Sequence, residues 1–356
     1  MTGPSLKHAI IGCGRVAPNH VAGVRHSGVA EVVWACDRDL AIATTFAEAH
    51  AIPKSSSDVH AVLAEPDVVS VSIAVDHAQH AALARAALLA GKHVLVEKPT
   101  AIRLSEAQAL TALAAERGLR LATIAQHRFD PLFIEIKRLV DAGALGDLVS
   151  VWTTLVCGRD PSYYSDSYWR GTWEGEGGSI LINQAYHCVD LMVALAGRPR
   201  VLSCHTGILK LGDVLQTEDV ATATFAFPNG ALGSLCCASA TTEFWRSRID
   251  LVGSQGSLAF DIDHPAKLHH VNLPEHIDTE GLWAAQVEGR EIAPGVEYYG
   301  ASHNRQIADF LQALHGDRAS RTPAEQGPIT LAVITDLYSR AQRTGEIDVK
   351  RLARLK

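Results

Sequence analysis

A short apolar strand that runs into a glycine-rich turn constrains the fold of this chain more than any other feature. Residues 7–11 are mostly apolar, and the hexapeptide GCGRVA at 12–17 follows them, ahead of a helix-type pattern. This order matches the Gly-x-Gly-x-x-Gly/Ala turn of dinucleotide-binding folds, with Ala17 in the third position. Gly12 allows the tight turn, Gly14 leaves room for a pyrophosphate, and the helix start offers unpaired N–H groups. A strand-to-helix turn without a ligand is the alternative.

An acidic residue follows the second expected strand, at residues 32–36. This residue, Asp37, stands about 20 residues beyond the glycine turn, where a carboxylate can accept hydrogen bonds from the adenosine ribose hydroxyls. It would repel a 2′-phosphate, so it favours NAD over NADP. Arg38 comes next and could pair with that phosphate or stack on adenine, which keeps NADP possible. A surface pair of Asp37 with Arg38 is the alternative without a ligand.

Strand and helix patterns alternate along the first third of the chain. Strands are expected at residues 68–73 and 93–96, with an alanine-rich helix at 78–89 between them. Such units pair in parallel through right-handed crossovers. The alternation predicts an α/β chain whose amino-terminal domain, residues 1–126, is a Rossmann domain with a parallel sheet.

The strand at 93–96 ends in Glu97-Lys98-Pro99. A lysine in this place lies at the carboxyl edge of the sheet, where open α/β sheets bind ligands. Lys98 is therefore a candidate catalytic residue. The alternative is a lysine that ends the strand and pairs with Glu97 in solvent.

Beyond residue 126 the pattern changes to two-faced strands, which predicts a second, α+β domain over residues 127–356 with a large open, mainly antiparallel sheet. Strands are expected at 148–156, 201–209, 220–227, 231–238 and 247–252. Pro228-Asn229-Gly230 predicts a hairpin turn. The stretch 278–300 is expected to be a loop or lid, and segments 307–314 and 329–341 are expected to be helices that pack back on the body.

A polar stripe marks one otherwise apolar helix, expected between Ser179 as its N-cap and Gly197 as its stop. Asn183, His187 and Asp190 fall at positions i, i+4 and i+7 and so share one helix face. An interior helix seldom carries three polar residues on one face unless that face lines a cavity. The alternative is a buried histidine that is hydrogen-bonded within its own helix.

Together these motifs resemble the glucose-fructose oxidoreductase, inositol dehydrogenase and rhizopine catabolism protein family, usually written Gfo/Idh/MocA. The resemblance rests on the glycine turn, on Glu97-Lys98-Pro99 and on the helix motif Gly-Gly-x-x-Leu-x-Asn-Gln-x-x-His-x-x-Asp at 177–190, and it covers nearly the whole chain. The segment Trp-Arg-Gly-Thr-Trp at 169–173 is similar to members that oxidise a ring hydroxyl of nucleotide-linked sugars. Further short motifs in the family's order stand at 128–131, 145–147, 218–219 and 302–306.

The resemblance implies an NAD(P)-dependent oxidoreductase that transfers a hydride between nicotinamide and a ring hydroxyl or ketone of a sugar, a nucleotide-linked sugar or a cyclitol. It implies that Lys98 and His187 are the catalytic lysine and histidine, and that Asn183 stands where many members carry aspartate. Such chemistry needs a base for the hydroxyl proton and a donor for the oxygen, roles that suit His187 and a desolvated Lys98. Residues 74–77 depart from the Thr-Pro-Asn that the family commonly carries beside the nicotinamide ribose.

The expected site draws residues from both domains. The catalytic residues are expected to be Lys98, His187 and Asn183. The cofactor is expected to contact Gly12, Cys13, Gly14, Arg15, Val16, Asp37, Arg38, Ala74, His77, Glu97, Lys98, Gln126, Trp169 and Arg170. The substrate is expected to contact Lys98, Arg128, Tyr163, Asn183 and His187. No metal is expected, because the histidine pairs at 77 and 80 and at 269 and 270 have no third ligand at a suitable spacing.

Two other functions share these motifs. An NAD-dependent glycosidase of the same family would use every residue named, whereas a non-catalytic cofactor-binding regulator would lack Lys98 or His187. In the family the open sheet face pairs subunits, so a homodimer or homotetramer is expected.

Composition bounds the partners and the cellular setting. A net charge of −7 without a basic tract argues against nucleic-acid binding. Seven cysteines without a Cys-x-x-Cys pair predict reduced core residues of a cytoplasmic protein. No apolar run reaches the roughly 18 residues that a membrane span requires, so no membrane partner is expected.

Overall fold

The chain folds into two compact units. The computed structural model describes residues 5–263, 265–289 and 300–343. The first unit contains the amino-terminal part up to Phe133 and the segment that ends at Ile329, and the second contains Ile134–Gln286 and the segment that begins at Thr330. The predicted domain boundary at residue 126 stays a prediction.

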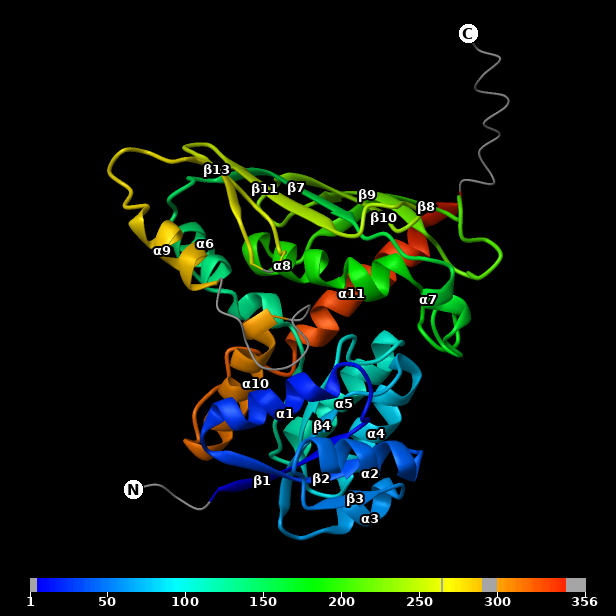
Figure 1. The fold of residues 1–356 in the computed structure, drawn as a ribbon. Coiled ribbons are helices and arrows are strands. Elements are labelled where there is room, and N and C mark those ends of the chain that lie inside the picture. Colours follow the sequence, from blue (N-terminus) through cyan, green and yellow to red (C-terminus); the bar gives the residue numbers. More distant parts are fainter. Residues whose placement is uncertain (1–4, 264, 290–299, 344–356) are drawn as a thin grey trace. The chain divides into compact units, whose positions relative to one another are not determined.

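The first unit is built on a six-stranded sheet in which every neighbouring pair is parallel, in the order β3-β2-β1-β4-β5-β6 (Figure 1). The strands are β1 (Leu6–Ile11), β2 (Ala30–Cys36), β3 (Lys54–Ser56), β4 (Val68–Ile73), β5 (His93–Val96) and β6 (Leu121–Thr123). The helices that connect them are α1 (Ala17–Ser27), α2 (Leu40–Ala49), α3 (Val59–Ala64), α4 (His77–Leu89) and α5 (Leu104–Glu116). The strand order reverses between β1 and β4, which places the topological switch point there. The predicted parallel Rossmann sheet is confirmed.

A helix from the carboxyl-terminal part of the chain completes this unit. Helix α10 (Gly300–His315) packs on α1, where Gly23 allows the close approach: a Cβ on Gly23 would lie 2.6 Å from the Cβ of Ile307. Val24, Ile307 and Phe310 share one buried cluster with Leu95 of β5. The sequence predicted this helix.

The second unit is built on a mixed, mainly antiparallel sheet of eight strands in the order β13-β12-β11-β7-β10-β9-β8-β14. The strands are β7 (Leu148–Val156), β8 (Arg200–Gly207), β9 (Val220–Ala226), β10 (Leu232–Ala238), β11 (Arg246–Gly253), β12 (Ser257–Phe260), β13 (Leu268–Asn272) and β14 (Ala341–Arg343). The predicted open sheet and the hairpin turn between β9 and β10 are confirmed. One neighbouring pair among the predicted strands departs from the antiparallel pattern, because β7 and β10 are parallel. A parallel pair needs a long connection, which the residues between β7 and the β8–β10 meander supply.

The helix predicted between Ser179 and Gly197 is broken in the structure. A turn of π-helix, η2 (Ile180–Gln184), comes first, and α8 (Tyr186–Ala196) follows and ends at Gly197. Ser179 does not cap it; its hydroxyl donates instead to the hydroxyl oxygen of Tyr164, at 3.2 Å. Because a π turn holds more residues than an α turn, the i, i+4 spacing that placed Asn183 and His187 on one face does not apply across this junction.

The predicted loop or lid at 278–300 contains a helix, α9 (Glu280–Glu288), and residues 290–299 lie outside the described residues. The remaining helices are η1 (Gln126–Phe129), α6 (Pro131–Asp141), α7 (Ser162–Ser165) and α11 (Gln326–Arg340). Helix α11 was predicted as one of the last two helices, and it starts in the first unit and continues into the second.

None of the seven cysteines forms a disulfide, and all except Cys236 are buried, as predicted for core residues. None of the helices in the described part of the chain combines the length and apolar character that crossing a bilayer requires.

Candidate functional site

The carboxyl ends of the parallel strands in the first unit gather most of the residues predicted to bind the cofactor, whereas Trp169 and Arg170 belong to the second unit. Each of those in the first unit follows a strand or lies just beyond one, and because the strands are parallel, all of them lie at the same edge of the sheet. They are Gly12 after β1, Asp37 after β2, Ala74 after β4, Lys98 after β5 and Gln126 after β6.

The two glycines of the turn have different surroundings: Gly12 is in close contact with the backbone, and Gly14 faces open space. Gly12 has a positive φ of 94°, and a Cβ there would collide with the carbonyl oxygen of Ala74. Gly14 is exposed, and a Cβ there would meet nothing within 4 Å. Helix α1 begins directly after Val16, which offers no side-chain cap to its first N–H groups. The turn therefore fits a phosphate-bearing cofactor.

Asp37 links the end of β2 to this turn. Its Oδ2 accepts a hydrogen bond from the Cys13 amide at 3.0 Å, and its Oδ1 accepts one from the Asp39 amide at 3.1 Å. The carboxylate is half-buried, whereas Arg38 and Arg15 are exposed. Two of the carboxylate's acceptor positions are used in this way, and an ionised carboxylate has further lone pairs that can receive ribose hydroxyls.

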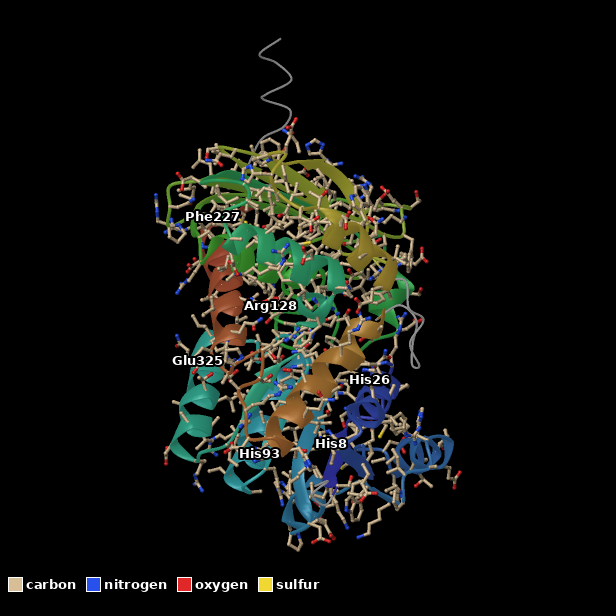
Figure 2. The ribbon with its side chains drawn as sticks, turned by 90° about the vertical axis from the view of Figure 1, so that its left-hand side faces the viewer. His8, His26, His93, Arg128, Phe227 and Glu325 are labelled. Carbon is tan, nitrogen blue, oxygen red and sulfur yellow. The ribbon has the colours of Figure 1, made fainter. Side chains whose placement is uncertain are left out.

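Gln126 supplies a second test of cofactor fit. It starts η1, is 5% exposed, and its Oε1 has no hydrogen-bond partner among the described residues. A buried acceptor without a donor costs free energy, and a bound amide could satisfy it. His77 is buried at the start of α4, and Arg128 is half-buried in η1 (Figure 2).

Glu97 and Lys98 are adjacent in the chain but differ in their surroundings. Lys98 is half-buried and precedes a cis proline, whereas Glu97 is buried with its carboxylate among histidines. Glu97 Oε1 lies 3.1 Å from His20 Nε2 and 3.0 Å from His303 Nε2, and Oε2 accepts from the Lys98 amide at 3.2 Å. The alternative that Glu97 pairs with Lys98 in solvent is wrong, because burial removes Glu97 from solvent. Its contact with the cofactor stays a prediction.

The charge of Glu97 is set by these histidines. Burial alone would raise the pKa of the Glu97 carboxyl, but the charge of His303 and hydrogen bonds from His20 and His303 outweigh it and hold the pKa well below its usual value. Neither histidine was predicted to be a site residue, although His303 lies in the short motif at 302–306. The ligand atoms of the three residues lie within 4.8 Å of one another, which is also close enough for a metal ion.

In the second unit a buried carboxylate orients Asn183. Glu176 is 0% exposed; its Oε1 accepts from Asn183 Nδ2 at 2.5 Å and its Oε2 from the Gly171 amide at 2.5 Å. Because an ionised carboxylate only accepts hydrogen bonds, the carbonyl end of the Asn183 amide is turned away from it. Glu176 was not predicted to be a site residue, because its contact with Asn183 depends on how the chain folds between them.

A second buried carboxylate, Glu218, holds the start of the π turn. Its Oε1 accepts from the amides of Ser179 and Leu181, both at 3.1 Å, and from the Tyr338 hydroxyl at 2.8 Å. Burial raises the pKa of Glu218 to about 7, the backbone and Tyr338 hydrogen bonds lower it in part, and the charge of Glu176 adds to the rise.

The predicted substrate residue Tyr163, in α7, is in contact with two arginines. The guanidinium carbon of Arg170 is 4.5 Å from the ring centre and that of Arg159 is 4.9 Å from it. Arg170 also stacks on Trp169 at 4.9 Å. Gln184 of the π turn donates to the Tyr163 hydroxyl at 3.3 Å, which ties this group to the segment that carries Asn183.

His187 is the second residue of α8 and is buried, with its ring centre 6.1 Å from that of Tyr186. Asp190, the third residue of the predicted stripe, accepts a hydrogen bond from Thr330 at 2.8 Å. Lys98 belongs to the first unit and His187 and Asn183 to the second. Their meeting in one site stays a prediction.

Comparisons with known proteins follow the two units. Residues 6–124 match the oxidoreductase family with an NAD-binding Rossmann fold, and residues 133–259 match the GFO/IDH/MocA C-terminal domain. The trans-1,2-dihydrobenzene-1,2-diol dehydrogenase of Bos taurus is 28% identical, over 66% of this chain and 68% of its own length. The D-apiose dehydrogenase of Paraburkholderia graminis is 25% identical, over 74% and 70%. The WlbA dehydrogenase of Bordetella pertussis, solved with NADH and UDP-GlcNAcA, is 25% identical, with 96% of each chain covered and a TM-score of 0.87.

Proposed function

Since the chain belongs to the GFO/IDH/MocA family of NAD-binding oxidoreductases, we propose that it is a dehydrogenase or ketoreductase that acts on a ring hydroxyl of a sugar. Its membership confirms the family resemblance and the NAD cofactor predicted from the sequence. The observation that carries the proposal is the carboxyl edge of the first sheet, where an open glycine turn, Asp37 and Lys98 follow neighbouring or nearby strands. Sugar dehydrogenases among the relatives support the substrate class.

The proposed roles divide the proton and the oxygen between two residues. NAD, when bound, supplies the hydride acceptor. His187 takes the proton of the substrate hydroxyl, and Lys98 holds the oxygen through its ammonium group, which stabilises the developing negative charge. Asn183 accepts a neighbouring hydroxyl through the carbonyl end that Glu176 turns away from itself.

We propose a nucleotide-linked or otherwise anionic sugar as the substrate. Arg159 and Arg170 both place their guanidinium groups against the Tyr163 ring. Guanidinium groups stacked on an aromatic ring keep their donors in a plane, which suits a diphosphate or a carboxylate. The WlbA dehydrogenase was solved with such a ligand.

We propose a homodimer or homotetramer paired through the large sheet. Helix α8 lies on one face of that sheet (Figure 1). The residues exposed on β7 and β10 are Val149 at 54%, Trp152 at 49%, Leu232 at 57% and Cys236, whereas Val151 and Leu235 of these strands are buried. Exposed large apolar side chains on these central strands support a contact between copies at this sheet. Light scattering at micromolar concentration tests it: a multiple of 38.2 kDa is expected, and a monomer would contradict it.

The test of the function starts from purified protein. A denatured extract is examined for released nicotinamide, and absorbance at 340 nm is followed with NAD or NADP and a panel of nucleotide sugars, free sugars and cyclitols. Reduction of NAD with one substrate is the expected result. Release of free sugar from a glycoside without net reduction would indicate the glycosidase, and cofactor binding without turnover of any substrate would indicate a regulator. Failure to bind either cofactor would contradict all three.

A further inference from the structure

A continuous chain of hydrogen bonds crosses the interior of the first unit and ends at Glu97. His8 Nδ1 lies 2.8 Å from Ser70 Oγ, and His8 Nε2 lies 2.9 Å from Ser72 Oγ. His20 continues the chain, with Nδ1 2.9 Å from Ser72 Oγ and Nε2 3.1 Å from Glu97 Oε1. Each of these five side chains is buried.

Helix α10 supplies the second histidine on Glu97. His303, 1% exposed, places Nε2 3.0 Å from Glu97 Oε1, and its ring centre is 5.2 Å from that of His20. Gln306, one turn later, accepts from the Ala125 amide at 2.7 Å and donates to the Thr123 carbonyl at 2.9 Å. The helix is therefore bound through polar side chains to the ends of β5 and β6.

The protonation states of these side chains determine which atom donates in each hydrogen bond. Burial, with a smaller effect of His20, lowers the pKa of His8 to about 3, and burial lowers the pKa of His20 as well, so both rings are neutral at pH 7. An ionised Glu97 only accepts, so His20 donates from Nε2 and its Nδ1 accepts from the Ser72 hydroxyl. Ser72 Oγ then accepts from His8 Nε2, and His8 Nδ1 accepts from Ser70. Every donor has an acceptor.

Stability alone does not account for so many polar side chains in one interior. Replacing a buried ionic group by apolar side chains of similar volume is often neutral or stabilising. The chain ends instead at a specific atom, because the carboxylate that the histidines hold also accepts from the amide of Lys98 at 3.2 Å. The series of hydrogen bonds thus ends at the backbone amide of Lys98, the residue that we propose to hold the substrate oxygen.

We infer that His20 and His303 are positioning residues, which hold the Glu97 carboxylate in place so that it fixes the peptide carrying Lys98, with Ser70, His8 and Ser72 setting the tautomer of His20. This inference rests on the proposed function for the role of Lys98 in turnover. The arrangement of the protons does not depend on it.

A metal ion held by the same three residues would need the opposite proton arrangement. His20 and His303 would then present bare Nε2 atoms, and His20 would donate from Nδ1 to Ser72. The contact of 3.1 Å between His20 Nε2 and Glu97 Oε1 is a hydrogen bond, which places a proton on His20 Nε2. The tautomer of His20 therefore separates the two occupants.

The first experiment reads the protons without any substrate. Long-range ¹H–¹⁵N spectra of histidine-labelled full-length protein are compared before and after addition of Zn²⁺. His8 and His20 are expected to be neutral and protonated at Nε2, with no change on Zn²⁺. Protonation of His20 at Nδ1, or a shift on Zn²⁺, would overturn the inference in favour of a metal site.

The second experiment compares His303→Leu, which loses the donor, with His303→Gln, which keeps an N–H near the position of Nε2. The Lys98 amide resonance is expected to move in His303→Leu and to stay in His303→Gln. kcat is expected to fall about 10- to 100-fold in His303→Leu only, with KM for NAD little changed, because a small misplacement of a reacting group costs about that much. An unchanged Lys98 amide resonance would overturn the inference.

A Lys98→Ala background separates the inference from the proposed function. There His303→Leu is expected to add no further loss, because the histidine acts through Lys98. An equal loss in both backgrounds would overturn the inference. If Lys98→Ala alone keeps the wild-type turnover, the proposed role of Lys98 fails, and the tautomers and the Lys98 amide resonance still decide whether the histidines hold the peptide.

Discussion

Each unit holds a buried carboxylate, and the pKa values of the two are shifted in opposite directions. Glu97 in the first unit has its pKa held well below the usual value, because the charge of His303 and hydrogen bonds from His303 and His20 outweigh burial. Glu218 in the second unit has a pKa raised to about 7, because burial outweighs its hydrogen bonds from two backbone amides and Tyr338. Because both carboxylates are buried, their neighbouring donors and charges decide whether the pKa falls or rises.

The difference extends to the second oxygen of each group. Both oxygens of Glu97 accept hydrogen bonds, Oε1 from His20 and Oε2 from the Lys98 amide, and His303 Nε2 lies 3.0 Å from Oε1. Oε2 of Glu218 has no partner among the described residues. The surroundings of Glu97 thus stabilise an ionised carboxylate, whereas Glu218 has room for a proton on Oε2. A buried acid near a candidate site is therefore not evidence of acid–base catalysis until its donors have been counted.

Replacing each carboxylate by its amide tests this comparison with the largest expected effect. In Glu97→Gln the new NH₂ group must face a donor, because all positions around Glu97 donate, so we expect a loss of about 3–5 kcal/mol in the free energy of unfolding. In Glu218→Gln the NH₂ group can occupy the unpartnered Oε2 position, so the loss at pH 6 is expected to stay below about 1 kcal/mol. Urea denaturation measures both, with exposed Glu116→Gln as the control. Equal losses would contradict the comparison.

The pH dependence of stability sharpens the same contrast. The folded pKa of Glu218 lies above the unfolded value of 4.5, so the folded state binds more protons and its stability falls as the pH rises from about 4.5 to about 7. The loss is at most about 3 kcal/mol, and it levels off above that window. Glu218→Gln is expected to gain on the wild type by this amount between pH 5 and pH 8 in parallel urea titrations. A difference that stays constant with pH would show that Glu218 is ionised throughout.

The hydrogen bond between Glu176 and Asn183 can be tested by exchanging the carboxylate and the amide between the two positions. Asn183→Asp places two carboxylates 2.5 Å apart in the interior, and we expect a loss of about 1–3 kcal/mol at pH 8 that is recovered in part at pH 5, where one of them is protonated. The double variant Glu176→Gln/Asn183→Asp restores one donor and one acceptor. Its stability is expected to return toward the wild type. A double variant with the summed loss would contradict the hydrogen bond.

Asp37 is the half-buried counterpart of these acids and should control the choice of cofactor. Replacing Asp37 by Ser removes the charge that repels a 2′-phosphate, so we expect affinity for NAD to fall about tenfold and affinity for NADP to rise. Titration of nicotinamide fluorescence with NADH and NADPH measures both. Asp39→Ser, two residues later and exposed, is the control. An unchanged preference would remove Asp37 from the cofactor site.

The sequence predicts well what depends on one strand and its end. Strand β4 matches the predicted residues 68–73, and Asp37 and Lys98 follow their strands as predicted, because an apolar run and its stop are local signals. The three-residue strands β3 and β6 are too short for such a pattern. The π turn at Ile180–Gln184 went unseen because an apolar sequence does not distinguish it from an α turn.

The hydrophobic pattern of the sequence could not predict contacts between residues that are far apart in the chain. His20 meets a carboxylate 77 residues away, and Glu218 holds amides 37 and 39 residues before it. One signal was present: Ser70 and Ser72 alternate in an otherwise apolar buried strand, which places two hydroxyls on one face. Pairing with His8 on the neighbouring strand required the sheet order.

The most direct test of the proposed activity is the rate of NADH formation at 340 nm with a nucleotide sugar, measured for the wild type, Lys98→Ala and His187→Ala. The account predicts turnover by the wild type and losses of about 10²- to 10⁴-fold in each variant, since each removes a proton-transfer or oxygen-binding group. NADH binding is expected to be retained in His187→Ala. Turnover that persists in both variants would contradict the assignment of the site.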